Sequence, residues 1–178
     1  MRIIGGKYKS YNFNPPRNID ARPTTDRAKE SLINILISSD GIEEKNCLDI
    51  FCGTGNISFE FASQGANFIT SVDVNANAVL FVKNTFKSLG FENFEAIKKN
   101  AFKWIAEKHN KQYDIIFADP PYDLADIDKL PGMIFNSDLI FENTILIIEH
   151  RSNFQFVNNY LYDTRKYGQS AFSFFRKN

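Results

Sequence analysis

Residues 47–66 read CLDIFCGTGNISFEFASQGA, and this stretch decides the fold class of the chain. It runs from an apolar segment, typical of a buried strand, through a turn holding Gly53 and Gly55 into a helical segment. Glycine tolerates positive φ and lets a ligand approach the backbone closely. The helix that follows offers free N–H groups and the positive end of its dipole. The stretch therefore predicts a strand–turn–helix unit with a ligand at the turn.

Strands and helices continue to alternate on both sides of this unit. The expected strands are 47–51, 67–73, 94–99, 113–118 and 144–149. The expected helices are 56–64, 76–89, 101–109 and 124–135. Such alternation predicts a parallel sheet covered by helices on both faces. Two more strand-like segments, 160–167 and 171–176, are separated only by Gly168-Gln169, which predicts a closing antiparallel pair.

The first 40 residues predict a smaller appendage to this sheet. Residues 1–13 look like two short strands joined at Gly5-Gly6, and residues 14–23 form a proline-containing linker. Thr24 or Thr25 then offers an N-cap. The run that follows has helical spacing, with its apolar face at Ala28, Leu32, Ile35 and Leu36.

The composition fits one aromatic-rich globular domain. The chain has 178 residues, 43% of them hydrophobic, with 18 Phe and 7 Tyr. The sequence shows neither a run of the ~20 apolar residues that a membrane span requires nor an N-terminal secretory stretch, so we expect a cytoplasmic protein. Cys47 and Cys52 lie in one apolar segment, which favours two buried thiols over a disulfide framework or a metal site.

The zero net charge hides an uneven distribution. Residues 1–30 carry seven basic and three acidic side chains, and residues 150–178 carry five and one, so each end has a charge of +4. The middle of the chain carries −8. Basic ends around an acidic centre are compatible with a nucleic-acid footprint, but ordinary solvated charge explains the sums equally well.

Polar residues follow the expected strands at their carboxyl ends. Asp73 ends the second strand, where an acid can accept both hydroxyls of a ribose, as in nucleotide-binding α/β folds. Asn100-Ala101 ends the third strand, where a side-chain oxygen and a backbone N–H could read an adenine edge. A dinucleotide fold would show G-x-G-x-x-G, but Ser58 replaces the last glycine, and Asp49 precedes the turn. The pattern favours a nucleotide other than NAD.

The stretch FADPPYD, at 117–123, ends the fourth strand and carries the chemistry. Two prolines cannot continue a central strand, so the chain passes abruptly from Asp119 into a rigid turn. A carboxylate and the carbonyl of Pro120 could each accept one hydrogen of an exocyclic nucleobase amine and turn its lone pair toward an electrophile. Tyr122 could stack on the extruded base. The arrangement predicts methylation of the amine by a sulfonium methyl.

The chain is similar to a known family in these segments. DPPY with an upstream D-x-F-x-G-x-G turn resembles the S-adenosylmethionine-dependent amino-methyltransferases. RIIGG at 2–6, RPTTDRAKE at 22–30, LDIFCGTG at 48–55 and YGQSAFSFFR at 167–176 resemble more specifically the bacterial 16S rRNA guanine-N2 methyltransferases. The resemblance covers essentially the whole chain.

This resemblance implies a single class I methyltransferase (Rossmann-like) domain at 1–178, α/β in class. It implies a seven-stranded, mostly parallel sheet with the last strand antiparallel, plus an N-terminal β-hairpin and helix. Residues 1–23 would contact RNA, and residues 24–178 would form the S-adenosyl-L-methionine-binding catalytic core. The target would be the 2-amino group of one guanine in 16S rRNA, within a 30S particle. The protein would act as a monomer, without a metal ion or a membrane.

The expected residues form three sets. The catalytic set is Asp119, Pro120, Pro121 and Tyr122. The cofactor-binding set is Asp49, Phe51, Cys52, Gly53, Thr54, Gly55, Asp73, Val74, Asn100 and Ala101. The RNA-binding set is Arg2, Lys7, Lys9, Arg17, Arg22 and Arg27. The chain departs from the family at Cys52, where alanine is frequent, at Asp73, where glutamate is usual, and at Asn100, where aspartate is common.

Other functions remain open at this point. A DNA adenine-N6 methyltransferase shares DPPY, but the chain has no room for a separate target-recognition domain. A non-catalytic RNA-binding assembly factor would be expected to lose the carboxylate or the glycine turn, and both are present. An NAD-dependent oxidoreductase conflicts with Ser58. His109 and His150 are expected to be structural.

Overall fold

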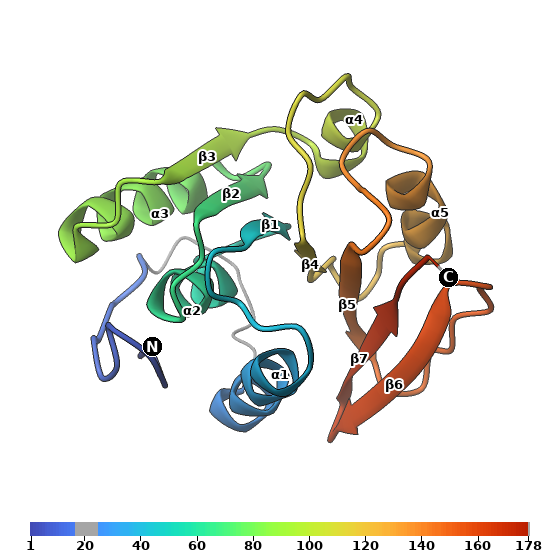
Figure 1. The fold of residues 1–178 in the computed structure, drawn as a ribbon, viewed down its shortest axis with the longest axis horizontal. Helices are drawn as coiled ribbons and strands as arrows, with labels where there is room; N and C mark the ends of the chain where they lie inside the picture. The colour runs from blue at the N-terminus through green and yellow to red at the C-terminus, as the bar shows by residue number, and fades with distance from the viewer. Residues whose placement is uncertain (17–24, 178) are drawn as a thin grey trace.

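The computed structural model describes residues 1–16 and 25–177, which contain one seven-stranded sheet (Figure 1). The strand order is β3-β2-β1-β4-β5-β7-β6. The strands are β1 (Asn46–Ile50), β2 (Phe68–Asp73), β3 (Phe94–Lys98), β4 (Ile115–Ala118), β5 (Ile145–Arg151), β6 (Leu161–Tyr167) and β7 (Ser170–Phe175). Strands β1 to β5 are parallel, and β7 runs antiparallel to both β5 and β6. The predicted class I methyltransferase sheet, with its antiparallel last strand, is confirmed.

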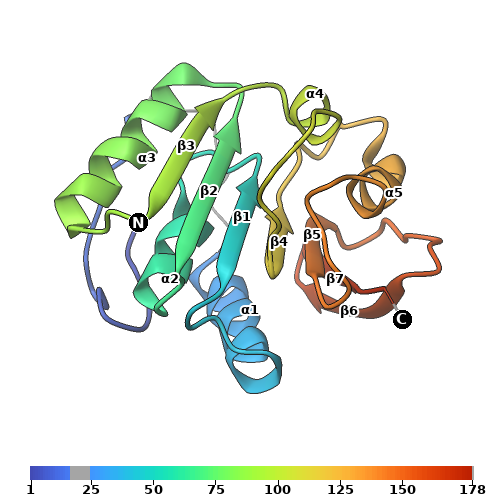
Figure 2. The ribbon, with the colours of Figure 1, turned by 45° about the horizontal axis from the view of Figure 1, so that its top comes forward.

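Helices cover both faces of this sheet (Figures 1 and 2). On one face lie α1 (Asp26–Ser39), α2 (Asn56–Ser63) and α3 (Ala76–Leu89); on the other lie α4 (Ala101–Ile105) and α5 (Leu130–Phe135), the latter preceded by a 3-10 turn, η1 (Ile127–Lys129). The edge strand β6 is largely exposed and polar, which suits a strand without a neighbour on its outer side. None of the helices in the described residues is long and apolar enough to cross a membrane.

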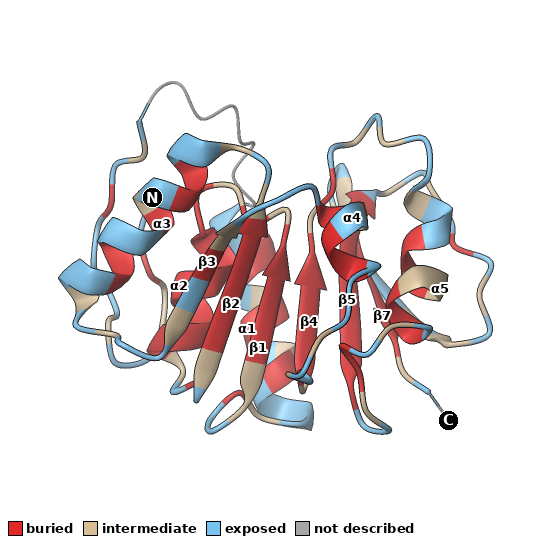
Figure 3. Cartoon of the chain, turned by 90° about the horizontal axis from the view of Figure 1, so that it is seen from above, coloured by how far each residue is buried: buried red, intermediate tan, exposed pale blue. Residues whose placement is uncertain are grey.

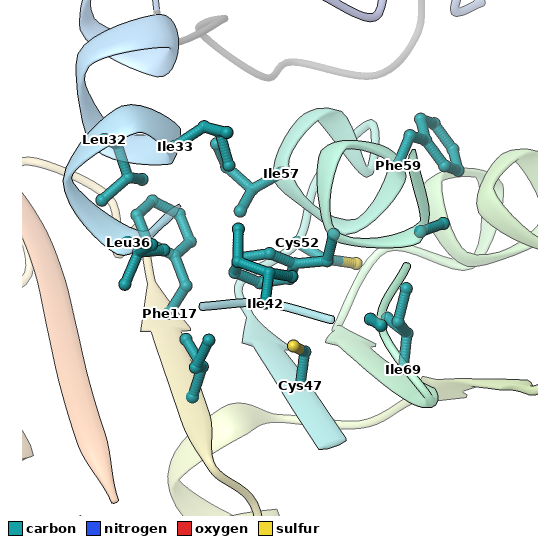
Figure 4. Close-up of a cluster of buried hydrophobic side chains, with 14 of the residues drawn as sticks. Leu32, Ile33, Leu36, Ile42, Cys47, Cys52, Ile57, Phe59, Ile69 and Phe117 are labelled. Carbon is teal, nitrogen blue, oxygen red and sulfur yellow. The ribbon is translucent and has the colours of Figure 1, made fainter. Parts of the chain in front are cut away.

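The central strands are buried on both sides, so their residues divide between two cores (Figure 3). In β4, Ile115 and Phe117 pack toward α1, α2 and α3, whereas Ile116 and Ala118 join the core beneath α4 and α5. This alternation follows from the two-residue period of a strand. Cys47 and Cys52 belong to the first core (Figure 4), and burial holds the pKa of both thiols well above the ordinary value. The prediction of two buried thiols is confirmed.

The two ends of the N-terminal segment 1–13 pair with each other as predicted, but the chain does not reverse direction at Gly5-Gly6. An antiparallel bridge joins Arg2 to Asn12, while residues 4–10 form a wide loop, so a tight turn at Gly5-Gly6 is wrong. Gly6 has φ +72°, and a Cβ there would lie 1.9 Å from the carbonyl oxygen of Ser63. The glycine pair therefore serves a close approach to α2 rather than a hairpin turn.

Three helices test the sequence prediction in detail, and two of them, α4 and α5, have different boundaries. Helix α1 begins after Thr25, whose Oγ1 accepts from the Ala28 N–H, so the predicted N-cap is confirmed; the helix buries Ile33 more deeply than the expected Ile35. Helix α4 ends at Ile105 rather than at residue 109, and the Trp104 carbonyl accepts from both the Glu107 N–H and the His109 ring. The predicted helix 124–135 forms only from Ile127, beginning as a 3-10 turn.

The parallel strands end at one edge of the sheet. Because β7 is antiparallel, its first residue lies at that same edge, opposite Arg151 at the end of β5 and Tyr167 at the end of β6. Strand ends from across the sheet therefore border one region, where open α/β sheets bind their ligands.

Candidate active site

A cleft of about 1310 Å³ lies along the carboxyl edge of the sheet. Its walls come from the ends of β1, β2, β4 and β5, the N-cap and first residues of α4, the start of α1 and the β6–β7 turn. Ligand pockets commonly occupy ~300–1,000 Å³, so this cleft has room for more than one small molecule. The geometry allows a cofactor and a second reactant to lie side by side.

The first wall is the turn after β1, and its backbone is unusual. Phe51 has φ +62° although it has a side chain, and Gly53 has φ +50°. The Cys52 N–H donates to Val72 in β2, and the Gly55 N–H donates to Cys52, so the turn is closed by its own backbone. Phe51, Cys52, Gly53 and Thr54 line the cleft.

Gly55 does not line the cleft, although the sequence placed it in the cofactor set. It is the N-cap of α2 with φ +74°, and a Cβ there would lie 2.8 Å from Val82 and 2.9 Å from Phe59. Glycine is required at this position by packing of α2 against α3. The structure explains Gly55 by this packing, and its place in the cofactor set stays a prediction.

Asp73, at the end of β2, holds the glycine turn by hydrogen bonds. Its Oδ2 accepts from the Gly53 N–H at 2.8 Å, and its Oδ1 accepts from the Asn75 N–H at 2.8 Å. A carboxylate oxygen has a second lone pair, so both oxygens retain acceptor capacity. Asp73 is half-buried and lines the cleft, beside the exposed Val74.

Asp49 lies beneath the turn and is buried. Its Oδ2 accepts from the Ser58 N–H at 3.1 Å and from the Ser58 hydroxyl, which also bonds the Ser71 hydroxyl at 2.8 Å. Burial raises the pKa of Asp49 to about 7 against the lowering effect of the Ser58 bonds. Ser58, whose presence argued against a dinucleotide motif, therefore anchors the carboxylate under the turn.

The residues after β3 form a second wall. The Asn100 side-chain oxygen accepts from the Lys103 N–H at 3.1 Å and so caps α4. Asn100 and Ala101 line the cleft together with Phe102, whose ring lies edge-on to Phe51 at 6.1 Å between centroids. The side-chain oxygen expected to read an adenine therefore also caps a helix, and its second lone pair remains available for a ligand contact.

The DPPY turn forms the third wall. The Asp119 N–H donates to the Ile50 carbonyl at 3.2 Å, which ties the turn to the end of β1. Asp119, Pro120, Pro121 and Tyr122 all line the cleft, and the Leu124 N–H closes the turn on the Pro121 carbonyl. The structure thus brings the expected catalytic set to the same cleft as the expected cofactor set.

The expected RNA-binding residues separate. Arg27 lines the cleft. Arg2 pairs with Asp26 at 3.2 Å, and the Lys7 ammonium lies over the Tyr8 ring at 5.1 Å. Lys9 is exposed on the 4–10 loop away from the cleft lining, and Arg17 and Arg22 fall outside the described residues.

Two features were missed by the sequence analysis. The cleft-lining residues of the C-terminal strands and of the β6–β7 turn received no role; they are Glu149, Arg151, Lys166, Tyr167, Gly168, Gln169 and Ser170. Their signal was the antiparallel last strand, which returns the β6–β7 turn to the carboxyl edge. The second feature is a buried ion pair of Lys29 with Glu60. Its signal was a lysine in register with the apolar face of α1.

Comparison with known proteins places the chain beside methyltransferases. The family model described as conserved hypothetical protein 95 matches residues 1–176. A relative from Buchnera aphidicola, named ribosomal RNA small subunit methyltransferase D, is 32% identical over 152 residues, which cover 85% of this chain and 76% of the relative.

Solved structures show the same fold. The Escherichia coli protein yhhF, described as a candidate methyltransferase, superimposes with a TM-score of 0.87 and 25% identity, covering 99% of this chain and 97% of that one. A Thermus thermophilus 16S rRNA N2 guanine methyltransferase, solved with AdoMet and guanosine, superimposes with a TM-score of 0.75 and 16% identity over all of this chain and 49% of that one.

Proposed function

We propose that this chain, which belongs to the conserved hypothetical protein 95 family, is an S-adenosyl-L-methionine-dependent methyltransferase of small-subunit rRNA, acting on the N2 amine of one guanine. The observation that carries the proposal is the placement of Asp119 and Tyr122 in one cleft with Asp73 and the turn at Gly53. A nucleotide-type site and an amine-orienting carboxylate then share a common space. The substrate is 16S rRNA in a 30S particle, and the enzyme acts as a monomer.

The residues at the ends of β1, β2 and β3 fit S-adenosyl-L-methionine. Asp73 retains acceptor capacity for two ribose hydroxyls, and positive φ at Phe51 and Gly53 presents the turn's backbone to the methionine portion. Ala101 and Phe102 provide an N–H and a ring beside the adenine position. When bound, the cofactor supplies an electrophilic sulfonium methyl. Its positive charge suits four of the carboxylates that line the cleft: Asp73, Asp119, Asp123 and Glu149.

Asp119 and the Pro120 carbonyl orient the amine of the target base. Each accepts one N2 hydrogen, so the nitrogen lone pair, otherwise delocalised into the ring, points toward the methyl group. Because two consecutive prolines fix the backbone, the acceptors are in place before the base arrives. The carboxylate also stabilises the positive charge that develops on nitrogen, and the proton is then lost to water.

The test is the product formed on 30S particles from cells lacking the gene. Purified protein and S-adenosyl-L-methionine should give one N2-methylguanosine in 16S rRNA, identified by nuclease digestion and mass spectrometry. Asp119→Ala should lower kcat by ~10²–10³, the usual loss for one preorganised polar partner, with little change in cofactor affinity. Asp138→Ala removes an exposed carboxylate outside the cleft and serves as the control. N6-methyladenosine as the product, or near-normal turnover by the Asp119 variant, contradicts the proposal.

A further inference from the structure

Three strand ends meet beside the DPPY turn, and Ser170 lies at their centre. Ser170 begins β7 and pairs in register with Arg151 of β5 and with Tyr167 of β6. All three residues line the cleft. This meeting point is built by the reversal of β7, which brings residues almost 50 positions beyond Tyr122 to its side.

Tyr122 makes two contacts with this meeting point. Its hydroxyl lies 2.6 Å from the Ser170 hydroxyl, close enough for a hydrogen bond in either direction. The Arg151 guanidinium lies over the Tyr122 ring, 5.2 Å from its centroid, within the range of a cation–π contact. Tyr122 itself sits on an irregular turn between β4 and η1, and the two contacts connect that turn to the sheet.

We propose that Ser170 and Arg151 clamp Tyr122, and that they act as positioning residues for the base that stacks on its ring. The inference rests on the proposed function, because it deepens the account of the base-binding site. The hydroxyl contact fixes the far end of the ring, while the guanidinium occupies one of its faces. The guanidinium therefore excludes a base from that face of the ring. Since Asp119 is three residues upstream on the same rigid turn, fixing the ring also fixes the distance from the stacked base to its amine acceptors.

The clamp predicts a coupled pair of hydroxyls. Tyr122→Phe and Ser170→Ala each remove one partner while keeping the ring, and each should lower kcat/KM for 30S particles by roughly three- to tenfold, as expected for one neutral hydrogen bond. The double variant should lose no more than either single variant, because both changes break the same bond. Ser170→Thr retains a hydroxyl and should restore most of the activity. Affinity for S-adenosyl-L-methionine and the melting temperature should stay near those of the wild type in all four variants.

A matched control removes a hydroxyl from the same hairpin outside the cleft. Thr164 lies on β6, and its hydroxyl pairs with that of Ser173, so Thr164→Ala reports any general loosening of the hairpin. Losses that add in the Tyr122→Phe/Ser170→Ala variant, or equal losses in Thr164→Ala, would overturn the clamp.

Arg151 needs a test that separates ring contact from attraction of RNA phosphates. Arg151→Gln should lower kcat/KM in the wild-type background but have little further effect after Tyr122→Leu, which removes the ring. A residue that only binds phosphate would cause the same fold-loss in both backgrounds, and this result would exclude Arg151 from the clamp. Arg165→Gln, on β6 outside the cleft, controls for the loss of one positive charge.

Total methyl incorporation from labelled cofactor reads out the clamp, whereas the identity of the methylated nucleoside reads out the proposed function. A product other than N2-methylguanosine would refute the guanine assignment while leaving the coupling of Tyr122 with Ser170 measurable. Additive losses with the expected product would refute the clamp alone. Absence of methyl transfer by the wild type would overturn both.

Discussion

Replacing Lys29 by methionine should be among the most damaging single changes outside the cleft walls. The side chains of Lys29 and Glu60 are 1% and 0% exposed, and their charged atoms lie 2.8 Å apart. The ammonium also donates to the Arg2 carbonyl at 2.6 Å and to Asn56 Oδ1 at 2.9 Å, so its three hydrogens have three acceptors. The Ile4 N–H donates to the same Glu60 oxygen at 2.9 Å. This network fixes the N-terminal segment to α1 and α2.

Lys29→Met leaves a buried carboxylate without its cation. Breaking a buried pair in this way costs ~3–5 kcal/mol, a large part of the ~5–15 kcal/mol that stabilises a typical domain. For 178 residues and ~2.1 cal/mol/K of unfolding entropy per residue, that loss lowers Tm by roughly 8–13 °C. Urea unfolding and calorimetry measure both quantities. Lys83→Met, at an exposed position of α3, is the matched control.

The pH dependence of this effect follows from Glu60. Burial raises the pKa of Glu60 despite the opposing influence of Lys29, and loss of the cation raises it further. A carboxyl whose pKa is higher in the folded state binds more protons there, so its unfavourable contribution grows as pH rises above the unfolded pKa. The destabilisation by Lys29→Met should therefore be smaller at pH 5 than at pH 8. Adding Glu60→Gln should restore stability at pH 8, because the amide oxygen still accepts from Ile4. This reasoning would be refuted if Lys29→Met unfolded like the wild type. It would also be refuted if Lys29→Met/Glu60→Gln were less stable at pH 8 than Lys29→Met alone.

Three further predictions concern the cleft. Asp73→Ala should weaken S-adenosyl-L-methionine binding by ~1–3 kcal/mol in calorimetry, since it removes ribose acceptors and frees the Gly53 N–H; unchanged affinity would exclude Asp73 from the site. Burial raises the pKa of Asp49 to about 7, so ionisation of this carboxyl destabilises the folded state. The stability of Asp49→Asn relative to the wild type should therefore increase from about pH 4 to pH 7. Parallel profiles of stability against pH for the two proteins would contradict this. Arg27→Gln should reduce the salt slope of rRNA binding by ~0.7–0.9, one phosphate contact, without changing cofactor affinity, whereas an unaltered slope would mark Arg27 as an ordinary surface residue.

The sheet was predictable because its signals are local. Apolar runs such as 115–118 and 145–148 have no polar face, which only a strand buried on both sides explains. The glycine turn and DPPY carry their own conformational preferences, so strand ends and loop chemistry could be inferred together. The prediction of local structure failed where contacts with distant segments determine the backbone conformation. Gly5-Gly6 has the composition of a hairpin turn, yet Gly6 is needed for its approach to Ser63 of α2.

Candidate site residues could be predicted from the sequence where they directly follow a strand. Contacts between two residues that are far apart in the sequence could not. Nothing near Tyr122 in the sequence points to Ser170, because 48 positions separate them and only the antiparallel pairing of β7 unites them. Asn100 shows that one position can fit two roles, and its predicted adenine contact stays a prediction. Its position suggested a ligand contact, but an asparagine before a helix also suits an N-cap, and its oxygen accepts from Lys103.

The uneven charge along the chain acquires a meaning at the cleft. Among the described residues, the basic side chains that line it are Arg27, Arg151 and Lys166, which come from the two basic ends of the sequence. Its carboxylates all come from the acidic middle. Different interactions bring the two ends of the chain to the carboxyl edge of the sheet. The buried Lys29–Glu60 pair holds the N-terminal end, and the antiparallel direction of β7 places the C-terminal end. On the proposed function, carboxylates at the strand ends suit a sulfonium cation, and basic side chains from both ends suit the phosphates of an RNA strand. The +4, −8, +4 pattern, ambiguous as a sum, therefore fits a site that holds a cationic cofactor and a polyanionic substrate together.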